Sequence, residues 1–319
     1  MSGFTLRRSR GKFLGVFAVA AALVLSFAVS PAAAGTSQTA SWTDTCDGQA
    51  NGFSSLDQLT ESSTARGGVV REPALSQTAT EIGPRKGRGA RFGAKVPTYV
   101  HVVHHANGTG NVSNKAIRDQ MQVLNMTFGG FEGGVATGFS FDLAGITRTA
   151  NTEWYLAGPT TSGERAMKQA LRQGGDNALN MYLTTAGVYL GWAYFPNVLE
   201  NATRYLDGIV VDWESMVGTS TRYAGQYDLG KTVPHEVGHW LNLHHVFNGG
   251  CNNFGDYVED TPPQRIATFG CPEGQDSCRE PGLDSIHNYM DYSFDSCYNQ
   301  FTAGQALRMQ DAWLEWRAS

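Results

Sequence analysis

The pattern of apolar positions along the chain changes near residue 96. Residues 96–104 alternate β-branched or aromatic side chains with polar ones, as in a strand, and residues 114–128 place apolar side chains at helical spacing. Similar patterns predict a helix over 164–173 and strands over 139–147, 178–184 and 206–213, the last one at a sheet edge. Helices and strands joined by long glycine-rich connections predict an α+β (mixed α/β) domain.

A strongly apolar run lies near the amino terminus. It spans Phe13–Val29, follows four basic residues with no acidic one, and leads into small residues that end at Ala34. These features are typical of a secretory signal peptide, here residues 1–34. A membrane anchor is the alternative, but the run is at the short end of what crosses a bilayer and lacks a charged stop. We therefore expect a secreted, extracellular protein without stable membrane association.

Residues 35–95 are rich in Ser, Thr, Gly and Gln and have little periodic apolar pattern. Such a segment buries little surface by itself, and its basic end at 84–91 is open to proteases. We interpret it as a pro-segment that is processed between about Arg66 and Lys95. An extension without a role is the alternative. The main domain then spans residues 96–319.

Charge argues against one class of partner. The whole chain has a formal net charge of −5, but residues 96–319 hold 13 basic and 23 acidic side chains, a balance of −10. A field of this sign repels phosphate backbones, so we expect no nucleic-acid binding. Bound cations and cationic substrates fit it better. With 41% hydrophobic residues the chain can bury a sizeable core. Separately, we expect the protein to be a monomer.

The sequence HEVGHWLNLHH at 235–245 carries the candidate chemistry. His235 and His239 lie one turn apart on a helix, so both imidazoles can reach one tetrahedral zinc ion at roughly 2.0–2.1 Å. Glu236 can point into the same cleft without being a ligand, where it would take a proton from zinc-bound water and deliver it to the leaving amine. Zinc lowers the pKa of that water to about 7.

His245 adds a third imidazole ten residues after His235. A continuous helix would carry it about 15 Å away, so the chain must turn back after roughly Leu241. The spacing resembles the long signature H-E-x-x-H-x-x-G-x-x-H of metzincin proteases. Asn242 stands where that family has glycine, and Asn is the other residue that best tolerates left-handed geometry. Spacing favours His245 as the third ligand, with His244 as the alternative.

A second stretch, NYMDY at 288–292, resembles the metzincin Met-turn, in which a buried methionine lies beneath the three histidines. The resemblance gives Met290 that role. It also implies that Tyr292 lies near the metal, as a ligand or as a hydrogen-bond donor in the transition state. Together with GDYVEDTPPQ and FTAGQALRM, these motifs make most of residues 96–319 similar to small secreted members of the pappalysin family of metzincins, related to ulilysin.

The pappalysin resemblance implies a twisted mixed sheet, an active-site helix and an irregular C-terminal half. Export favours two disulfides among the four cysteines of the C-terminal quarter, and the residues alone leave three pairings open. The pairing of the family, placed on this chain, would be Cys251 with Cys278 and Cys271 with Cys297.

The same resemblance implies a structural calcium ion in this half of the domain. One loop offers hard oxygen ligands from Asp256, Glu259, Asp260 and Thr261. A solvated acidic loop is the alternative. Asp295 resembles the acidic residue that gives arginine-preferring relatives their S1′ pocket, which implies cleavage on the N-terminal side of Arg or Lys. A surface aspartate is the alternative there.

Cys46 lies in the predicted pro-segment and is left over after two disulfides. In several metzincin zymogens a pro-segment cysteine thiolate occupies the open fourth position on zinc, and thiolate is a strong zinc ligand. The surrounding residues lack the Arg-Cys-Gly pattern expected of such a latch. A latch by Asp44 or Asp47, or an incidental or intermolecular thiol, are the alternatives.

The leading hypothesis is a secreted zinc endopeptidase, made as a zymogen and acting on protein or peptide substrates. One rival is a gluzincin, whose third ligand is a downstream Glu, and another is a non-catalytic secreted binding module. His245 together with Met290 argues against the first, and the presence of Glu236 argues against the second. The remaining histidines are expected to be structural or at the surface: His101, His104, His105 and His287.

Overall fold

A five-stranded sheet lies in the first half of the described domain. The computed structural model describes residues 92–200, 202–252 and 255–318. The predicted signal peptide, nearly all of the predicted pro-segment and Cys46 lie outside these residues, so they stay predictions. The strands are β1 (Ala94–His104), β2 (Phe139–Ala150), β3 (Leu179–Thr184), β4 (Gly191–Ala193) and β5 (Ile209–Asp212).

The described helices are α1 (Asn114–Phe128), α2 (Thr152–Tyr155), α3 (Ser162–Leu171), α4 (Thr232–Trp240) and α5 (Ala303–Trp316), with short 3-10 helices η1 (Pro196–Glu200), η2 (Arg204–Leu206) and η3 (Trp213–Ser215). Four of the five described α-helices begin at a side-chain cap, and α4 does not. α1 has the bounds expected from the sequence, and the Ser113 side chain accepts the Ala116 N–H at its start. α3 starts two residues earlier than expected because Thr161 is its N-cap.

The strand order is β2-β1-β3-β5-β4, with β4 antiparallel to β5 and the other neighbours parallel. The four expected strands are confirmed, with ends that differ by at most three residues. The expected edge position of the strand at 206–213 is wrong, because β4 lies outside β5. β4 spans only Gly191–Ala193, which is too short to show a periodic pattern in the sequence.

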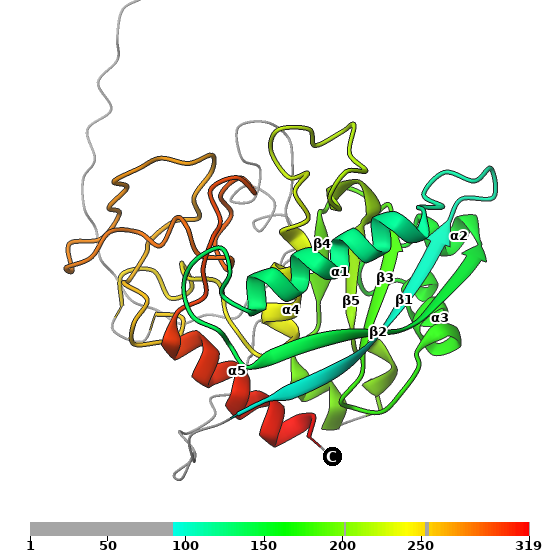
Figure 1. Ribbon diagram of the computed structural model, residues 1–319, viewed down its shortest axis with the longest axis horizontal. Helices are drawn as coiled ribbons and strands as arrows, with labels where there is room; N and C mark the ends of the chain where they lie inside the picture. The colour runs from blue at the N-terminus through cyan, green and yellow to red at the C-terminus, as the bar shows by residue number, and fades with distance from the viewer. Residues whose placement is uncertain (1–91, 201, 253–254, 319) are drawn as a thin grey trace, which may run out of the picture. The chain divides into compact units, whose positions relative to one another are not determined.

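Helices cover both faces of the sheet (Figure 1). On one face, Val100 and Val211 belong to a core that includes apolar residues of α1 and α4. On the other face, Tyr182 and Val210 pack with Met167 of α3. Because it is covered on both sides, β3 is buried along its whole length.

The C-terminal half is irregular and cross-linked, as expected. Between α4 and α5 the described residues form no helix and no strand beyond an isolated bridge from Asn288 to Gln300. Disulfides join Cys251 to Cys278 and Cys271 to Cys297, which confirms the pairing implied by the pappalysin resemblance. Figure 1 shows this half, coloured yellow to red, beside the sheet.

Buried contacts of Arg317 attach the end of α5 to Asp207, which follows η2, and to the end of α4. The guanidinium of Arg317 lies 3.6 Å from the centre of the Trp240 ring and donates to both carboxylate oxygens of Asp207, at 3.1 and 3.2 Å. It also donates to the Trp240 carbonyl at 2.9 Å. Both charged side chains are fully buried, and Arg172 is a second, more distant cationic partner of Asp207 at 3.7 Å. The two buried charges are therefore compensated mainly by each other.

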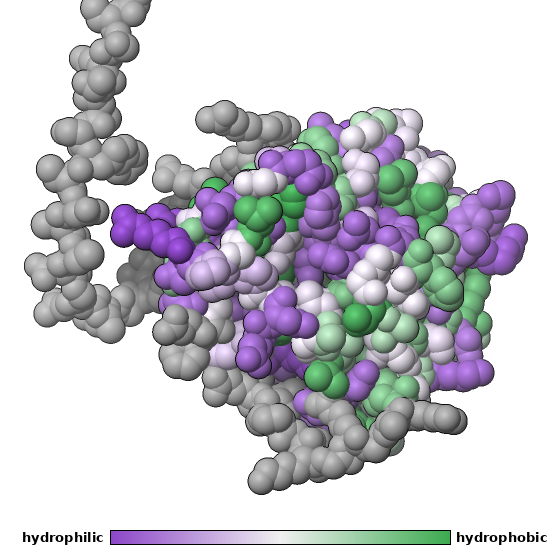
Figure 2. All heavy atoms as spheres, turned by 60° about the vertical axis from the view of Figure 1, so that its left-hand side comes forward, coloured by the Kyte–Doolittle hydropathy of each residue, from purple (hydrophilic) through white to green (hydrophobic). Residues whose placement is uncertain are grey.

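The surface of the C-terminal half mixes polar and apolar side chains. Figure 2, which brings this side forward, shows apolar residues scattered among polar ones on the visible face. Exposed apolar residues of this half include Ile266 and Leu283. Single apolar side chains at the surface are normal in folded proteins. Within the described ranges, no helix has the length and apolarity needed to cross a bilayer.

We predict that Arg317→Ala lowers the free energy of unfolding by about 3–5 kcal/mol, because it removes the nearest cationic partner of the buried Asp207 carboxylate and leaves only Arg172, 3.7 Å away. Denaturant unfolding with both disulfides intact measures the change. Arg118→Ala is the matched control, since Arg118 is an exposed arginine of α1 and its loss should change stability by less than about 0.5 kcal/mol. Equal effects of the two variants would contradict the role given to the ion pair.

Candidate active site

Helix α4 supplies the first two imidazoles of the site. The helix is buried along its whole length, and His235 and His239 lie one turn apart on it. Their Nε2 atoms are 3.2 Å apart. The structure therefore places both rings on the same side of the helix, as the i, i+4 spacing predicts.

The chain turns back directly after α4. Asn242 has a φ of 72°, in the left-handed region. Its N–H donates to the His239 carbonyl, and the N–H of Leu243 donates to the Gly238 carbonyl, each at 2.9 Å. These two bonds form a Schellman motif, which ends a helix at a left-handed residue. The prediction that Asn242 takes the positive φ of the family's glycine is confirmed.

This turn brings His245 back to the helix. Its Nε2 lies 3.0 Å from Nε2 of His239, and one nitrogen from each of His235, His239 and His245 lies within 4.8 Å of the others. His244 is directed elsewhere, with its Nδ1 2.9 Å from Nδ2 of Asn248. Burial lowers the pKa of His244 to about 3. The geometry thus adds His245, and not His244, to the pair on the helix.

Backbone carbonyls orient two of the three rings. Nδ1 of His235 donates to the Tyr289 carbonyl at 2.6 Å, and Nδ1 of His239 donates to the Leu243 carbonyl at 2.7 Å. Since Nδ1 carries the proton, the Nε2 lone pair of each ring faces the centre. Ligands at 2.0–2.1 Å from a tetrahedral zinc ion would be about 3.3–3.4 Å apart. The Nε2 separations of 3.0 and 3.2 Å are close to that spacing, so the residues fit zinc.

Met290 lies against helix α4. Its side chain is fully buried, and a Cβ atom added to Gly238 would collide with its sulfur. A glycine in the helix therefore allows the close approach of the methionine. The Val246 N–H donates to the Met290 carbonyl at 3.2 Å, which joins the segment after His245 to the same turn. This placement agrees with the Met-turn expected from NYMDY.

Glu236 and Tyr292 lie beside the imidazoles. Glu236 is buried against Gly191 of β4, where an added Cβ would lie 2.9 Å from its Oε1. The ring centre of Tyr292 lies 5.8 Å from that of His235 and 4.9 Å from that of His245. The Tyr292 ring thus lies next to two of the imidazoles, and the Glu236 carboxylate, from the residue after His235, lies between α4 and β4.

The sequence is similar to that of known extracellular metalloproteases. The family described as pregnancy-associated plasma protein-A, peptidase M43, matches residues 207–314. The extracellular metalloprotease 1 of Coccidioides posadasii is 44% identical over 260 residues, which cover 79% of this chain and 90% of that protein. The chain belongs to the pappalysin family of metzincins. It is an extracellular metalloendopeptidase, as the motifs predict.

Other relatives and solved structures agree with the pappalysin assignment. An extracellular metalloprotease of Pyricularia oryzae is 45% identical over 228 residues, or 70% of this chain and 76% of that protein. Mirolysin in complex with compound 9 superposes with a TM-score of 0.61 at 29% identity, covering 69% of this chain and 91% of that chain. Mature mirolysin of Tannerella forsythia in complex with a cleaved peptide superposes with a TM-score of 0.58 at 29% identity. The match covers 69% of this chain and 92% of that chain. The expected fold class is confirmed.

The acidic loop of this pappalysin does not gather its four candidate calcium ligands at one point. Oδ1 of Asp256 accepts a hydrogen bond from Oγ1 of Thr261 at 2.8 Å. Asp260 instead accepts from Oγ1 of Thr302, the N-cap of α5, at 2.7 Å. Glu259 is exposed. Burial raises the pKa of Asp256 to about 7, so this carboxylate is the unusual member of the loop.

Asp295 is buried, which contradicts the alternative of a surface aspartate. Its Oδ2 accepts the N–H groups of Leu229 at 2.9 Å and of Lys231 at 3.2 Å. Its own N–H donates to the Gln226 carbonyl at 2.8 Å. The carboxylate therefore holds the segment that leads into α4.

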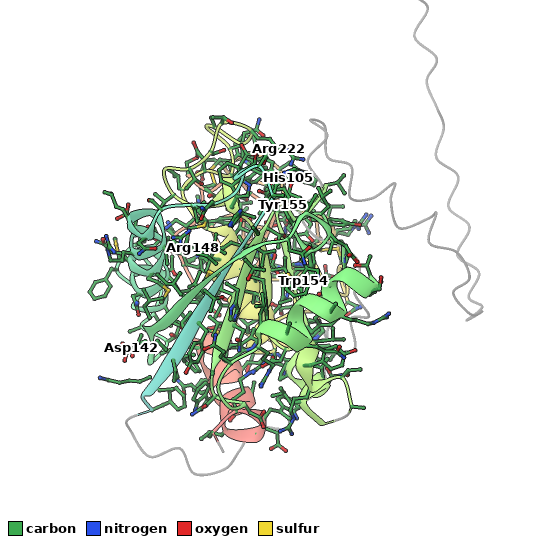
Figure 3. The ribbon with its side chains drawn as sticks, turned by 90° about the vertical axis from the view of Figure 1, so that its right-hand side faces the viewer. His105, Asp142, Arg148, Trp154, Tyr155 and Arg222 are labelled. Atoms are coloured by element: carbon green, nitrogen blue, oxygen red, sulfur yellow. A yellow bond between two sulfur atoms is a disulfide. The ribbon has the colours of Figure 1, made fainter. Side chains whose placement is uncertain are left out.

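The remaining histidines have structural contacts. His101 is buried, with its Nε2 2.9 Å from Oδ1 of Asn180, and burial lowers its pKa. His105, directly after β1, lies close to Tyr155 in Figure 3, with the ring centres 6.0 Å apart. Nδ1 of His287 donates to a backbone carbonyl at 2.7 Å. Among the described residues, the two other groups with three or more possible metal ligands both contain disulfide-bonded cysteines.

Two features of the site are missing from the sequence-based predictions. Gly191 contacts the general-base candidate Glu236, and its only signal is a glycine inside the apolar run YLGWAYF. Glu132, from the loop after α1, contacts Lys231 at the start of α4. Its signal is the pair of glycines on each side of it in GGFEGG.

We predict that Asn242→Ala lowers the free energy of unfolding by about 1–2 kcal/mol. Alanine has a Cβ atom but no short polar side chain that can hydrogen-bond locally, so it is strained at positive φ. Asn242→Gly should stay within about 1 kcal/mol of wild type, since glycine accepts this conformation. Denaturant unfolding of the two variants side by side is the measurement. An alanine variant as stable as the glycine variant would rule out strain as the reason for Asn at this turn.

Proposed function

We propose that His235, His239 and His245 bind one zinc ion and that this pappalysin uses it to hydrolyse peptide bonds in extracellular proteins. The observation that carries the proposal is the convergence of three Nε2 atoms at separations of 3.0 and 3.2 Å. When bound, zinc polarises the scissile carbonyl and makes a water molecule nucleophilic at neutral pH. The remaining tasks fall to side chains of the chain itself.

Glu236 is the proposed general base and acid. It takes a proton from the attacking water and delivers it to the leaving amine. Packing between α4 and Gly191 of β4 limits the movement of its carboxylate. β4 is the terminal strand of the sheet, and extended peptides bind along such strands through main-chain hydrogen bonds. A substrate bound there would bring its scissile bond past Glu236.

Tyr292 is the proposed donor to the oxygen of the scissile carbonyl as negative charge develops on it. Support comes from its ring contacts with His235 and His245. The buried carboxylate of Asp291 accepts the Tyr292 N–H at 2.8 Å and the Thr268 N–H at 2.9 Å. These bonds hold the backbone that carries the phenol.

The two rival functions fit the geometry less well. A gluzincin would not need His245 beside His239, yet their Nε2 atoms are 3.0 Å apart. A binding module would not need a buried glutamate next to the first histidine of the cluster, yet Glu236 follows His235 and is buried. Both observations favour the metzincin mechanism.

We propose further that the enzyme is made as a zymogen, with residues 1–34 for export and a pro-segment that ends at or before Arg91. The ring of Phe92 lies 5.0 Å from that of Phe139, and Ala94 pairs with Phe139 between β1 and β2. A cut after these residues would remove part of the folded domain, whereas the basic stretch 84–91 precedes it. Cys46 remains the proposed latch on zinc.

Calcium binding is proposed at Asp256, with Thr261 as a second ligand and without Asp260. Oδ2 of Asp256 is buried and has no hydrogen-bond partner among the described residues. Calcium takes carboxylate and other oxygen ligands, and a bound cation would compensate the cost of burying this carboxylate.

A preference for Arg or Lys on the primed side of the bond is the proposed specificity. Asp295 supports it as a buried carboxylate three residues after Tyr292. The balance of −10 over residues 96–319 favours basic substrates in general and disfavours nucleic acids.

We predict that Glu236→Ala still binds one equivalent of zinc but loses at least about 100-fold in kcat on a denatured protein substrate, because the general base is gone and the three histidines remain. Metal analysis and a cleavage assay measure the two properties. Glu153→Ala, which removes an exposed glutamate of α2, should keep wild-type activity. Unchanged turnover of Glu236→Ala would sink the mechanism, and a wild-type protein without zinc would sink the whole proposal.

A second prediction concerns specificity. The measured quantity is the ratio of two kcat/KM values, one for a peptide with Arg after the scissile bond and one for the same peptide with Leu there. Asp295→Asn should reduce this ratio by about 30-fold or more, because a buried charge pair with the substrate is lost. Asn can still accept the N–H groups of Leu229 and Lys231, which preserves the segment before α4. Asp276→Asn, at an exposed aspartate, is the control. An unchanged ratio would refute the proposed pocket.

A further inference from the structure

The loop after α1 lies against the segment that follows the Met-turn. Figure 1 shows this loop beside the C-terminal half. The Val135 N–H donates to the Phe301 carbonyl at 3.2 Å, and a Cβ added to Gly134 would collide with the same carbonyl. Gly134 has a φ of 68°. Glycines on both sides of Glu132 thus allow a tight loop that brings this carboxylate to the C-terminal half.

Glu132 meets two buried groups from different parts of the chain. Its Oε2 accepts a hydrogen bond from the Tyr289 hydroxyl at 2.6 Å and forms an ion pair with Nζ of Lys231. Tyr289 is fully buried and Lys231 is 4% exposed. A separation of 2.6 Å is typical of a hydroxyl donating to a charged carboxylate, which is among the stronger hydrogen bonds in proteins.

Both partners of Glu132 act directly on His235. The Tyr289 carbonyl accepts the Nδ1 proton of His235 at 2.6 Å, and the Lys231 carbonyl accepts the His235 N–H at 3.2 Å. Lys231 is the N-cap residue of α4. Glu132 therefore joins the start of the helix that carries His235 to the residue that orients the ring of His235.

Burial of Lys231 and Tyr289 favours one arrangement of these three side chains. The side chain of Lys231 is 6% exposed and that of Glu132 is 27% exposed, so loss of the carboxylate would leave a buried ammonium without its partner. A shift of the Met-turn away from α4 would separate Tyr289 from Glu132 or Glu132 from Lys231. The three side chains consequently favour the position of the Tyr289 carbonyl in which it can accept from His235.

We infer that Glu132 is a positioning residue for the metal centre, which holds the imidazole of His235 in its ligating orientation through Lys231 and Tyr289. The inference rests on the proposed function, in which His235 binds zinc. Glu132 itself contacts none of the three histidines by a hydrogen bond in the described structure and acts through the Tyr289 carbonyl. Outer partners of this kind change metal affinity by about 10- to 100-fold when they are removed.

The test compares Glu132→Gln and Tyr289→Phe with wild type. Zinc dissociation constants come from competition with a chelator, and visible spectra of the Co²⁺-substituted proteins report ligand geometry. We expect each variant to weaken zinc binding by about 10- to 100-fold and to alter the cobalt spectrum. The zinc dissociation constant of the double variant should be close to that of the single variant that binds zinc less tightly, because both changes break the same connection.

Two controls separate positioning from general stability. Glu153→Gln changes an exposed glutamate, and Met167→Ala opens a cavity in the core on the far face of the sheet from α4. Neither should change the zinc dissociation constant or the cobalt spectrum of the folded protein. A dissociation constant within twofold of wild type, or an unchanged cobalt spectrum, in both Glu132→Gln and Tyr289→Phe overturns the inference.

The outcomes also distinguish this inference from the proposed function. If wild type fails to bind zinc stoichiometrically, the proposed function fails. If wild type binds zinc and the two variants match it, only the role of Glu132 fails. Should Glu132→Gln not fold, Tyr289→Phe decides alone, since it keeps the ion pair of Glu132 with Lys231 and removes only the phenol oxygen.

Discussion

The hydrogen bond from Nδ1 of a histidine to a backbone carbonyl is the interaction on which the metal centre depends. An imidazole has two nitrogens, and the ring presents the correct one to an ion only if the other is held. For His235 the holding group is the Tyr289 carbonyl, and for His239 it is the Leu243 carbonyl. The backbone at 241–246 and at 288–292 therefore determines the ligand geometry. Contacts that fix these two segments contribute to the centre even when they lie far from it.

Small or left-handed residues make this geometry sterically possible. Gly238 leaves space on α4 for the sulfur of Met290, and Gly191 leaves space on β4 for the carboxylate of Glu236. Asn242, at a φ of 72°, reverses the chain so that His245 can reach His239. At each of these positions a bulkier side chain or a different backbone angle would displace a functional group. Helix, strand and turn are thus fitted to one another around the histidines.

The zinc motif, the Met-turn and most strands were predictable because their signals are local. Spacing of four residues on a helix places His235 beside His239, whatever the rest of the chain does. By contrast, Asp260 caps α5 through a contact 42 residues away, and Glu132 meets Lys231 across 99 residues. No periodic pattern in the sequence encodes such long-range pairings. The sequence therefore presents Asp260 as a candidate calcium ligand and gives no role to Glu132. β4 was missed for a different reason, since three residues are too few to show alternation.

The two disulfides are interlaced along the chain, because Cys271 lies inside the loop closed by Cys251 and Cys278, and Cys297 lies outside it. Each bond closes a loop of 26 or 27 residues, which removes roughly 3–4 kcal/mol of unfolded-state entropy in the chain-entropy account. This half has no regular helix or sheet to preserve its shape between α4 and α5 in the described structure. Reduced chains would therefore lose the support of the Met-turn. Support of the Met-turn is thereby coupled to formation of the two disulfides, which an oxidising compartment favours.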